Sequence, residues 1–447
     1  MNTSIPPTHS PTYNTFSIIE RNGFIKPSRL RFTMSQDYSA YEDALSSAEI
    51  IGTETLPHSW REAPRAWGNE LHKLAPYVGG FPPALANYLL QQYTDPEMTV
   101  LDPFSGGGTT ALEASLLDRD VLASDVFSYA CTLTGAKTHP LTEDEFDAAL
   151  KRVKRDADNV NPDMLPPVDE DAAIFFHEDT LQELRQYRAV LKEDTSRDGR
   201  FLKAVICGIL HGPSELFLSI QTRDTFSGSA NYVKDYKEKH DLEEVYKPVD
   251  EKVRDKFNRL VGAQYPSGST RVEQADATSL PFEDDTADFV LTSPPYMHML
   301  DYSWNNWLRL WWLDEDRSAE QDSLNQTSKV ELFRSFMTDV IAELDRVLKS
   351  DARAIIVIGD VRKHRQGGAK VVYPARMIAA EASEFGFEVE RVIEDDYNVD
   401  KRYYTQLNNL RWDEEEEDDG QELIDRILVL RKGDPGPQVE VTPEWSD

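Results

Sequence analysis

The sequence predicts an α/β fold, in which a doubly wound, mostly parallel sheet is interrupted by a mainly helical insertion. First, residues 99–125 read strand, glycine turn, helix and strand within the length of one βαβ unit. Second, strand-like runs alternate with helix-like stretches again over residues 266–435. Third, residues 140–265 contain long charged helical segments and few strand-like runs. The sheet domain is therefore expected in two pieces, one on each side of the insertion.

The first part of the chain is expected to hold a tail and one helix. Residues 1–34 are rich in Pro, Ser and Thr and show little periodicity, which predicts a flexible tail. The first piece of the sheet domain is residues 35–139. Within it, Pro82 and Pro83 suit the first turn of a helix and apolar residues follow at helical spacing, so a helix is expected at about 82–93.

The βαβ unit follows this helix. The stretch MTVLDPFSGGGTTALEASLLDRDVLASDV predicts a strand at 99–103, a glycine turn, a helix at 109–118 and a strand at 121–125. Parallel strands that are joined in this way require a right-handed crossover. The insertion comes next, with helical segments such as TEDEFDAALKRVKRDADNV and RFLKAVICGILHGPSELFLSI.

The second piece of the sheet domain supplies the remaining strands. The strand-like runs are TRVEQADATSLPF, ADFVLTSPPY, ARAIIVIGDV, FEVERVIEDD and DRILVLRK. Helices are expected between them at about 329–348 and 373–385. The acidic run at 413–419 is expected to be a solvated loop, and residues 436–447 to be a C-terminal tail.

The net charge of -32 is the most unusual feature of the composition. Binding to the phosphates of nucleic acids depends on Lys and Arg, so this charge by itself argues against nucleic acid. An acidic, halophilic proteome also explains it, because molar salt shortens the Debye length to about 3 Å and makes self-repulsion tolerable. We prefer the halophilic interpretation, under which the charge of the whole chain says little about the ligand.

Other features exclude several classes of protein. No apolar stretch approaches the roughly 20 residues of a membrane helix, and the N-terminus lacks the apolar region of a secretory signal, so a cytoplasmic protein with no membrane partner is expected. Cys131 and Cys207 lie far apart, without the spacing of a zinc site or a disulfide framework. The nine histidines form no metal-binding motif, and no metal is expected.

The glycine turn LDPFSGGGTT lies between a strand and a helix, where ligands meet the carboxyl ends of strands in such sheets. It is not a P-loop, since no Lys-Ser/Thr follows the glycines, and it does not match GxGxxG. Asp125 ends the next strand 17 residues after Gly108, where a carboxylate accepts ribose hydroxyls. Asp276, after the following strand, suits an adenine amino group. These residues predict a nucleoside ligand without polyphosphate, although a tight turn and turn aspartates are the structural alternatives.

The stretch Ser293-Pro294-Pro295-Tyr296 ends an apolar run that reads as a buried central strand. Proline lacks an N–H and holds φ near -65°, so two prolines form a stiff turn whose carbonyls have no ladder partners. These carbonyls and the serine hydroxyl suit the two hydrogens of an exocyclic amine on a base, and Tyr296 supplies a ring to stack on a base that has left the duplex. A strand terminator with a surface tyrosine is the structural alternative.

Together these residues resemble the amino-methylating, S-adenosylmethionine-dependent DNA methyltransferases, with matching motifs over about 70–135 and 270–432. Phe104, Gly106 and Gly108 match the FxGxG kernel of the cofactor motif. The Ser-Pro-Pro-Tyr form is most associated with cytosine-N4 enzymes, whereas adenine-N6 enzymes more often carry Asp or Asn before the prolines. PYVGGFPPALANYLL is similar to the helix-entry motif that lines the methionine part of the cofactor, and it departs from that motif at Gly79-Gly80. YMHMLDYSWNNWLRLWWL is similar to the continuation in one group of these enzymes.

The resemblance implies a Rossmann-like class I methyltransferase fold, S-adenosylmethionine as cofactor and DNA as partner. Cofactor-binding residues are then Asp102, Phe104, Gly106, Gly108, Thr109, Asp125 and Asp276, and catalytic residues are Ser293, Pro294, Pro295 and Tyr296. The order of the motifs implies that the insertion helps to recognise the target DNA. A site-specific enzyme of this kind is compatible with a role in restriction–modification beside a cognate nuclease.

Two segments are candidates for DNA contact. Residues 201–260 carry ten basic and ten acidic residues, so they are neutral within a very acidic chain, and Arg223, Tyr232 and Lys234 lie there. Arg362, Lys363 and Arg365 follow the strand AIIVIG, and we expect them in a basic loop that can hold phosphates. Ordinary solvated helices and a surface charge cluster are the respective alternatives.

Two rival functions stay open. An RNA base methyltransferase uses the same kind of site, but usually carries Asp or Asn before Pro-Pro-Tyr and a separate RNA-binding module. A catalytically silent nucleic-acid binder on the same fold would be expected to have lost the glycine turn or the Ser-Pro-Pro-Tyr motif, and both are intact here.

Overall fold

The structure of the protein is a computed structural model. It describes residues 48–52, 63, 67–80, 82–223, 226, 228–295, 297, 301–323, 327, 329–365, 368–395 and 424–433, with only the backbone for 321–323, 362–365 and 368–371. The described residues belong to one compact unit, Ser39–Asp447. The predicted tails at 1–34 and 436–447, the acidic run at 413–419 and Tyr296 lie outside the described residues.

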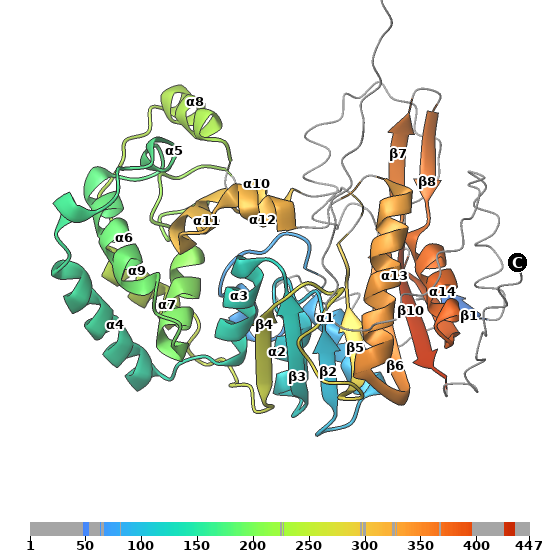
Figure 1. Cartoon of the computed structure of the whole chain (residues 1–447). Helices are drawn as coiled ribbons and strands as arrows, with labels where there is room; N and C mark the ends of the chain where they lie inside the picture. The colour runs from blue at the N-terminus through green and yellow to red at the C-terminus, as the bar shows by residue number, and fades with distance from the viewer. Residues whose placement is uncertain are drawn as a thin grey trace, which may run out of the picture. The chain divides into compact units, whose positions relative to one another are not determined.

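One sheet of eight strands organises the described residues, in the order β1-β9-β10-β6-β5-β2-β3-β4 (Figure 1). The strands are β1 Glu49–Gly52, β2 Thr99–Asp102, β3 Asp120–Asp125, β4 Thr270–Gln274, β5 Ala287–Thr292, β6 Leu348–Gly359, β9 Phe387–Asp395 and β10 Asp425–Lys432. Strand β10 runs antiparallel to both of its neighbours, and the other neighbouring pairs are parallel. This is the Rossmann-like arrangement that was predicted.

The order of strands reverses at β2. Strands β3 and β4 lie on one side of it, and β5 and β6 lie on the other. At such a reversal the crossover connections leave on opposite faces of the sheet, which opens a crevice at the carboxyl ends of the central strands. The predicted glycine turn follows β2 and the predicted proline turn follows β5, so the topology brings both to one place.

The expected helices of the sheet domain are confirmed. They are α1 Pro83–Tyr93, α2 Thr109–Leu116, α13 Val330–Val347 and α14 Pro374–Glu384. Proline occupies the first turn of α1, where its missing N–H costs no hydrogen bond. Helix α2 begins directly at the glycine turn, after Gly108.

The sheet is buried on both faces because side chains alternate along each strand. Val100 of β2 and Phe289 of β5 pack on the face covered by α1 and α2. Leu101 and Val290, one position further on, pack on the opposite face, against α13 and α14. A strand that is buried on both faces reads as a continuous apolar run, which is why ADFVLT predicted a central strand.

Between β3 and β4 the described residues form helices and no strand. These helices are α3 Ser128–Thr138, α4 Glu143–Asp158, α5 Glu170–Ala173, α6 Glu178–Leu191, α7 Arg197–Cys207, α8 Ala230–His240 and α9 Val249–Asn258, with a 3-10 turn at Pro162–Met164. Helix α4 starts with a capping box between Thr142 and Glu145, which satisfies backbone donors at both ends of the box. Helices α4, α6, α7 and α9 lie together beside the sheet (Figure 1), and their buried side chains belong to one hydrophobic core.

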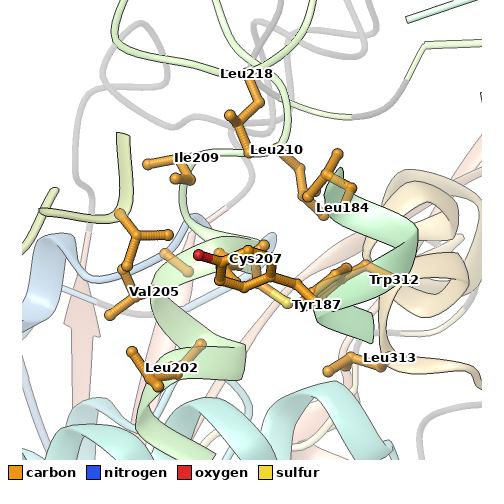
Figure 2. Packing of buried hydrophobic residues seen from close by; sticks show 14 of the residues in the cluster. Leu184, Tyr187, Leu202, Val205, Cys207, Ile209, Leu210, Leu218, Trp312 and Leu313 are labelled. Carbon is orange, nitrogen blue, oxygen red and sulfur yellow. The ribbon is translucent and has the colours of Figure 1, made fainter. Parts of the chain in front are cut away.

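The segment after the proline turn packs into the core of the insertion. It forms α10 Tyr302–Asn305, α11 Trp307–Leu313 and α12 Arg317–Ser323. Figure 2 shows Trp312 and Leu313 among buried side chains of α6 and α7. The indole N–H of Trp307 donates to the Gly228 carbonyl at 3.0 Å, so α11 is tied to the loop before α8.

The segment after β6 is a hairpin, and the expectation of a basic loop there was wrong. Strands β7 Val361–Arg365 and β8 Gly368–Val372 pair antiparallel. Only two residues separate them in the sequence, and links of this length are typical of hairpins. Val361 and Val372, a pair at the start of the hairpin, are buried in the same core as α13. This packing anchors the hairpin to the sheet domain. The charged residues in the stretch gave no sign of it.

Two further findings concern the described part of the chain. None of its helices combines the length and the apolar character that crossing a membrane requires. Within the same residues, no group of three or more His, Cys, Asp or Glu side chains is arranged to hold a metal ion.

Candidate functional site

An open cavity of about 790 Å³ lies at the carboxyl ends of β2, β3 and β5. The predicted site residues that line it are Asp102, Phe104, Gly106, Thr109, Asp125, Asp276, Ser293 and Pro295. The proline turn and the glycine turn, which lie almost 190 positions apart in the sequence, therefore share one cavity.

Each of the three glycines in the turn has a local reason to lack a side chain. Gly106 and Gly108 have positive φ values of 47° and 73°, a region that favours glycine. A Cβ on Gly108 would also lie 2.9 Å from the Oγ1 of Thr134. Gly107 has no such backbone demand, but its Cβ would lie 3.2 Å from the Cβ of Tyr77. Tyr77 is thus the neighbour that keeps the middle position small.

Asp125 anchors the glycine turn. Its Oδ2 accepts the Gly106 N–H at 2.8 Å, and its Oδ1 accepts the Phe127 N–H at 3.0 Å. Burial raises the pKa of this carboxyl to about 6, while the backbone donors lower it. At neutral pH the group is therefore largely ionised, and it can accept further hydrogen bonds from hydroxyl groups in the cavity.

Asp102 connects the end of β2 to the end of β5. Its Oδ1 accepts from the Thr292 hydroxyl at 2.7 Å and from the Phe104 N–H at 3.2 Å. Thr292 immediately precedes Ser293, so this bond fixes the start of the proline turn relative to the glycine turn. Burial raises the pKa of Asp102 to about 7, although the hydrogen bond from Thr292 lowers it.

Burial of the Asp102 carboxyl should lower the free energy of unfolding of the ligand-free protein as the pH rises. The folded state holds the Asp102 proton up to about pH 7, whereas the unfolded chain releases it near 3.8. The free energy of unfolding therefore falls across that window. The Asp102→Asn side chain stays neutral, so the stability of this variant relative to wild type should increase by on the order of 2 kcal/mol between pH 5 and pH 8. Thermal denaturation at the two pH values measures this gain. The exposed Asp120→Asn is the control, and an equal difference at both pH values would contradict the prediction.

Aromatic side chains that were not predicted as site residues form part of the cavity wall. The ring of Tyr77 lies 6.2 Å from that of Tyr302 and 5.9 Å from that of Tyr129. Phe104 meets Phe336 of α13 edge to face, with ring centroids 5.9 Å apart. Tyr77, Tyr302 and Phe336 line the cavity beside the predicted Phe104, whereas Tyr129 lies behind them. Tyr77 and Tyr302 lie in stretches that resemble family motifs, but Phe336 has the helical spacing of an ordinary core residue.

Asp276 lies two residues beyond the end of β4 and lines the cavity. Its Oδ1 accepts from both the N–H and the hydroxyl of Thr278, each at 2.9 Å. Because this turn uses both lone pairs of Oδ1, Oδ2 is the atom that can accept from a ligand. The turn therefore fits the predicted acceptor of an adenine amino group.

The charges of the cavity fit S-adenosylmethionine. Asp102, Asp125 and Asp276 line it, and no Lys or Arg occurs among the described residues of the wall. A polyphosphate would be repelled by this set, whereas a sulfonium and an ammonium group are attracted. Asp125 and Asp276 would hold the ribose and the adenine, and the glycine turn would hold the rest of the molecule. The residues that are present thus fit this cofactor.

The remaining predicted residues are placed as follows. Gly108 and Pro294 belong to the two turns without lining the cavity, and Tyr296 is outside the described residues. Arg223, Tyr232 and Lys234 are exposed, the latter two on α8. Arg362, Lys363 and Arg365 lie on β7, where only the backbone is described.

Comparison with solved structures finds several methyltransferases at low similarity. An S-adenosylmethionine-dependent methyltransferase from Methanosarcina mazei is 11% identical over 77% of this chain and 97% of that one, with a TM-score of 0.30. TrmN from Thermus thermophilus is 16% identical over 81% and 52%, with a TM-score of 0.28. The rRNA methyltransferase AviRa from Streptomyces viridochromogenes is 15% identical over 70% and 94%, with a TM-score of 0.25. No curated protein matches the chain.

The sequence profile of the N6/N4 DNA methylase family matches residues 29–134 and 287–436, which together are more than half of the chain. The first matched segment contains the glycine turn and the second contains Ser293. The unmatched stretch between them includes helices α4 to α9. S-adenosylmethionine, the cofactor that the resemblance implied, is the methyl donor of this family and is confirmed. The chain therefore belongs to the N6/N4 family of DNA methylases.

Proposed function

We propose that the protein is a site-specific DNA methyltransferase that methylates the exocyclic amino group of a flipped base, at cytosine N4. The observation that carries the proposal is that Ser293 and Pro295 line the same cavity as Gly106 and Gly107. A base amine at the proline turn and a methyl donor at the glycine turn would then meet without any large movement of the sheet.

The proline turn prepares the amine for reaction. Conjugation with the ring makes an exocyclic amine a poor nucleophile. The Ser293 side chain and the carbonyls of the turn accept its two N–H bonds in a tetrahedral arrangement, which frees the lone pair and directs it into the cavity. S-adenosylmethionine, when bound, supplies an activated methyl group there. Because the acceptors are held rigidly before the base arrives, little reorganisation is needed during reaction.

Two structural links support this preorganisation. The Thr292 hydroxyl donates to Asp102 at 2.7 Å, which fixes the residue before Ser293 to the end of β2. The Gly106 N–H donates to Asp125 at 2.8 Å, which fixes the glycine turn to the end of β3. The two turns are therefore held by neighbouring strands of one sheet, and their separation is set by the spacing of those strands.

For the choice of base, the proposal rests on the serine before the prolines, the form associated with cytosine-N4 enzymes. Adenine N6 is the second candidate on the same site. We propose that DNA is held by the insertion, with Arg223, Tyr232 and Lys234, and by the β7–β8 hairpin, with Arg362, Lys363 and Arg365. The enzyme would act in the cytoplasm, in a salt-loving host, on sites that a cognate restriction nuclease cuts.

The modified base can be identified directly. DNA from cells with and without the gene is digested to nucleosides and weighed by mass spectrometry. We expect N4-methylcytosine only where the gene is present, and its loss in cells that carry Ser293→Ala. N6-methyladenine in its place would transfer the assignment to the second candidate. Methylated bases in RNA alone would support the RNA rival, and unmodified DNA and RNA with intact cofactor binding would support a silent binder.

A further inference from the structure

A buried ammonium group lies behind the glycine turn. Lys137, on α3, is only 3% exposed and does not line the cavity. Its Nζ donates to the Gly107 carbonyl at 2.5 Å. The N–H of the same peptide, from Gly108, donates to the Ser105 carbonyl at 2.7 Å. The peptide after Gly107 is therefore held at both of its polar groups, and a Cβ added to Gly107 would lie 3.2 Å from the Cβ of Tyr77.

The cost of burying this charge calls for a reason. An ammonium group in the protein interior is expensive unless a carboxylate pairs with it. Among the described residues, no carboxylate lies within ion-pair distance of Lys137, and burial lowers its pKa to about 7, as Lys256 does to a smaller extent. A neutral amine at the same place could also donate to the Gly107 carbonyl. The hydrogen bond to Gly107 therefore does not explain why the buried side chain is one that can carry a positive charge.

The cavity provides the reason. Its wall carries Asp102, Asp125 and Asp276 and no cation among its described residues. The methionine part of the cofactor bears a carboxylate, which the ionised carboxylates of this wall repel. Lys137 does not line the cavity itself, but its buried ammonium group donates to the carbonyl of Gly107, which does.

We infer that Lys137 is a positioning residue for the cofactor, which holds Gly107 in place and offsets the negative wall so that the carboxylate of the methionine part can bind. The inference rests on the cofactor of the family and not on the nucleic acid that is methylated. It predicts that loss of the Lys137 charge weakens binding only of ligands that carry the amino-acid part. A lysine with a purely structural role would affect all ligands alike.

The test compares two ligands that differ in this part. S-adenosylhomocysteine carries the amino-acid carboxylate, and methylthioadenosine lacks the whole amino-acid part. Lys137→Met should weaken binding of S-adenosylhomocysteine roughly tenfold, the order expected for two charges separated by several ångströms of protein. It should leave binding of methylthioadenosine nearly unchanged. Isothermal titration calorimetry measures both constants without any methyl transfer.

Lys247 provides a matched control. It is also buried and also holds backbone carbonyls, those of Phe217 and Ser219 at 2.9 and 2.8 Å, but it lies in the insertion and not at the cavity. Lys247→Met should change neither constant, even if it lowers the melting temperature. Equal weakening of both ligands by Lys137→Met, or no weakening, would overturn the inference. A wild-type protein that binds neither ligand would instead refute the cofactor assignment.

A measurement on the wild-type protein gives a second test that does not depend on folding of a variant. As pH rises from 6 to 9, loss of the Lys137 charge should lower the affinity for S-adenosylhomocysteine relative to that for methylthioadenosine. The other ionisable groups nearby are Lys256 on α9, the hydrogen-bonded pair His72 and Glu113, and the wall carboxyls. Ionisation of Asp102 in this range also disfavours S-adenosylhomocysteine relative to methylthioadenosine, so the ratio is measured in Asp102→Asn as well, where only the Lys137 contribution remains. A constant ratio would contradict the inference.

Discussion

Ser293→Ala should slow methyl transfer by about 100-fold or more while leaving the affinity for S-adenosylhomocysteine nearly unchanged. In the proposed mechanism the variant removes one of the fixed acceptors of the base amine, and single preorganised groups of this kind are worth on the order of 100-fold in rate. Ser293 lines the cavity at the end of β5, but no hydrogen bond of the glycine turn passes through its side chain. Single-turnover transfer of a labelled methyl group to DNA measures the rate, and calorimetry measures the affinity.

Ser279→Ala is the control for this experiment. Ser279 is exposed and follows the Asp276 turn without lining the cavity. Its variant should keep the wild-type rate. If Ser293→Ala also transfers at the wild-type rate, Ser293 does not hold the amine. If it loses cofactor affinity in proportion to rate, the serine supports the cofactor and not the base.

Asp125→Ala should weaken cofactor binding by about 1–3 kcal/mol, which is between about fivefold and about 150-fold. The structure supplies two reasons for this loss. The first is that a ribose in the cavity would lose its carboxylate acceptor. The second is that the N–H groups of Gly106 and Phe127 lose the oxygens that fix the glycine turn. Titration with S-adenosylhomocysteine measures the effect.

Asp120→Ala is the matched variant on the same strand. Asp120 starts β3, and its Oδ1 accepts the Ser269 N–H at 3.0 Å, so it also holds a backbone donor. It lies at the amino end of the strand, away from the cavity at the carboxyl ends. Its variant should bind the cofactor as wild type does. Wild-type affinity in Asp125→Ala would remove Asp125 from the site, and equal losses in both variants would indicate a general weakening of the sheet.

The sheet was largely predictable because its signals are local. Runs such as ADFVLT and AIIVIG are apolar without alternation, the pattern of strands that are buried on both faces. The hairpin β7–β8 was missed because its charges suggested a loop, while the feature that anchors it is the packing of Val361 and Val372 against a core formed by distant residues. Strand β1 is four residues long and was not predicted at all.

The cavity was predictable only in part for a related reason. The glycine and proline turns carry their own sequence patterns, and both line it. Phe336 and Lys137 carry none, because the first reads as a core residue of a helix and the second as a lysine in the last turn of another. Their positions depend on how α13 and α3 pack on the sheet.

The sequence by itself determined most strands and helices of the sheet domain and the two turns that we propose carry the chemistry, since glycine, proline and apolar periodicity act on their immediate neighbours. Only the tertiary structure decided that these turns meet in one cavity, that Tyr77 limits the size of the middle glycine, and that a buried lysine stands behind it. Those contacts join residues far apart in the chain, and they follow from the strand order and the crossovers, which no local pattern contains.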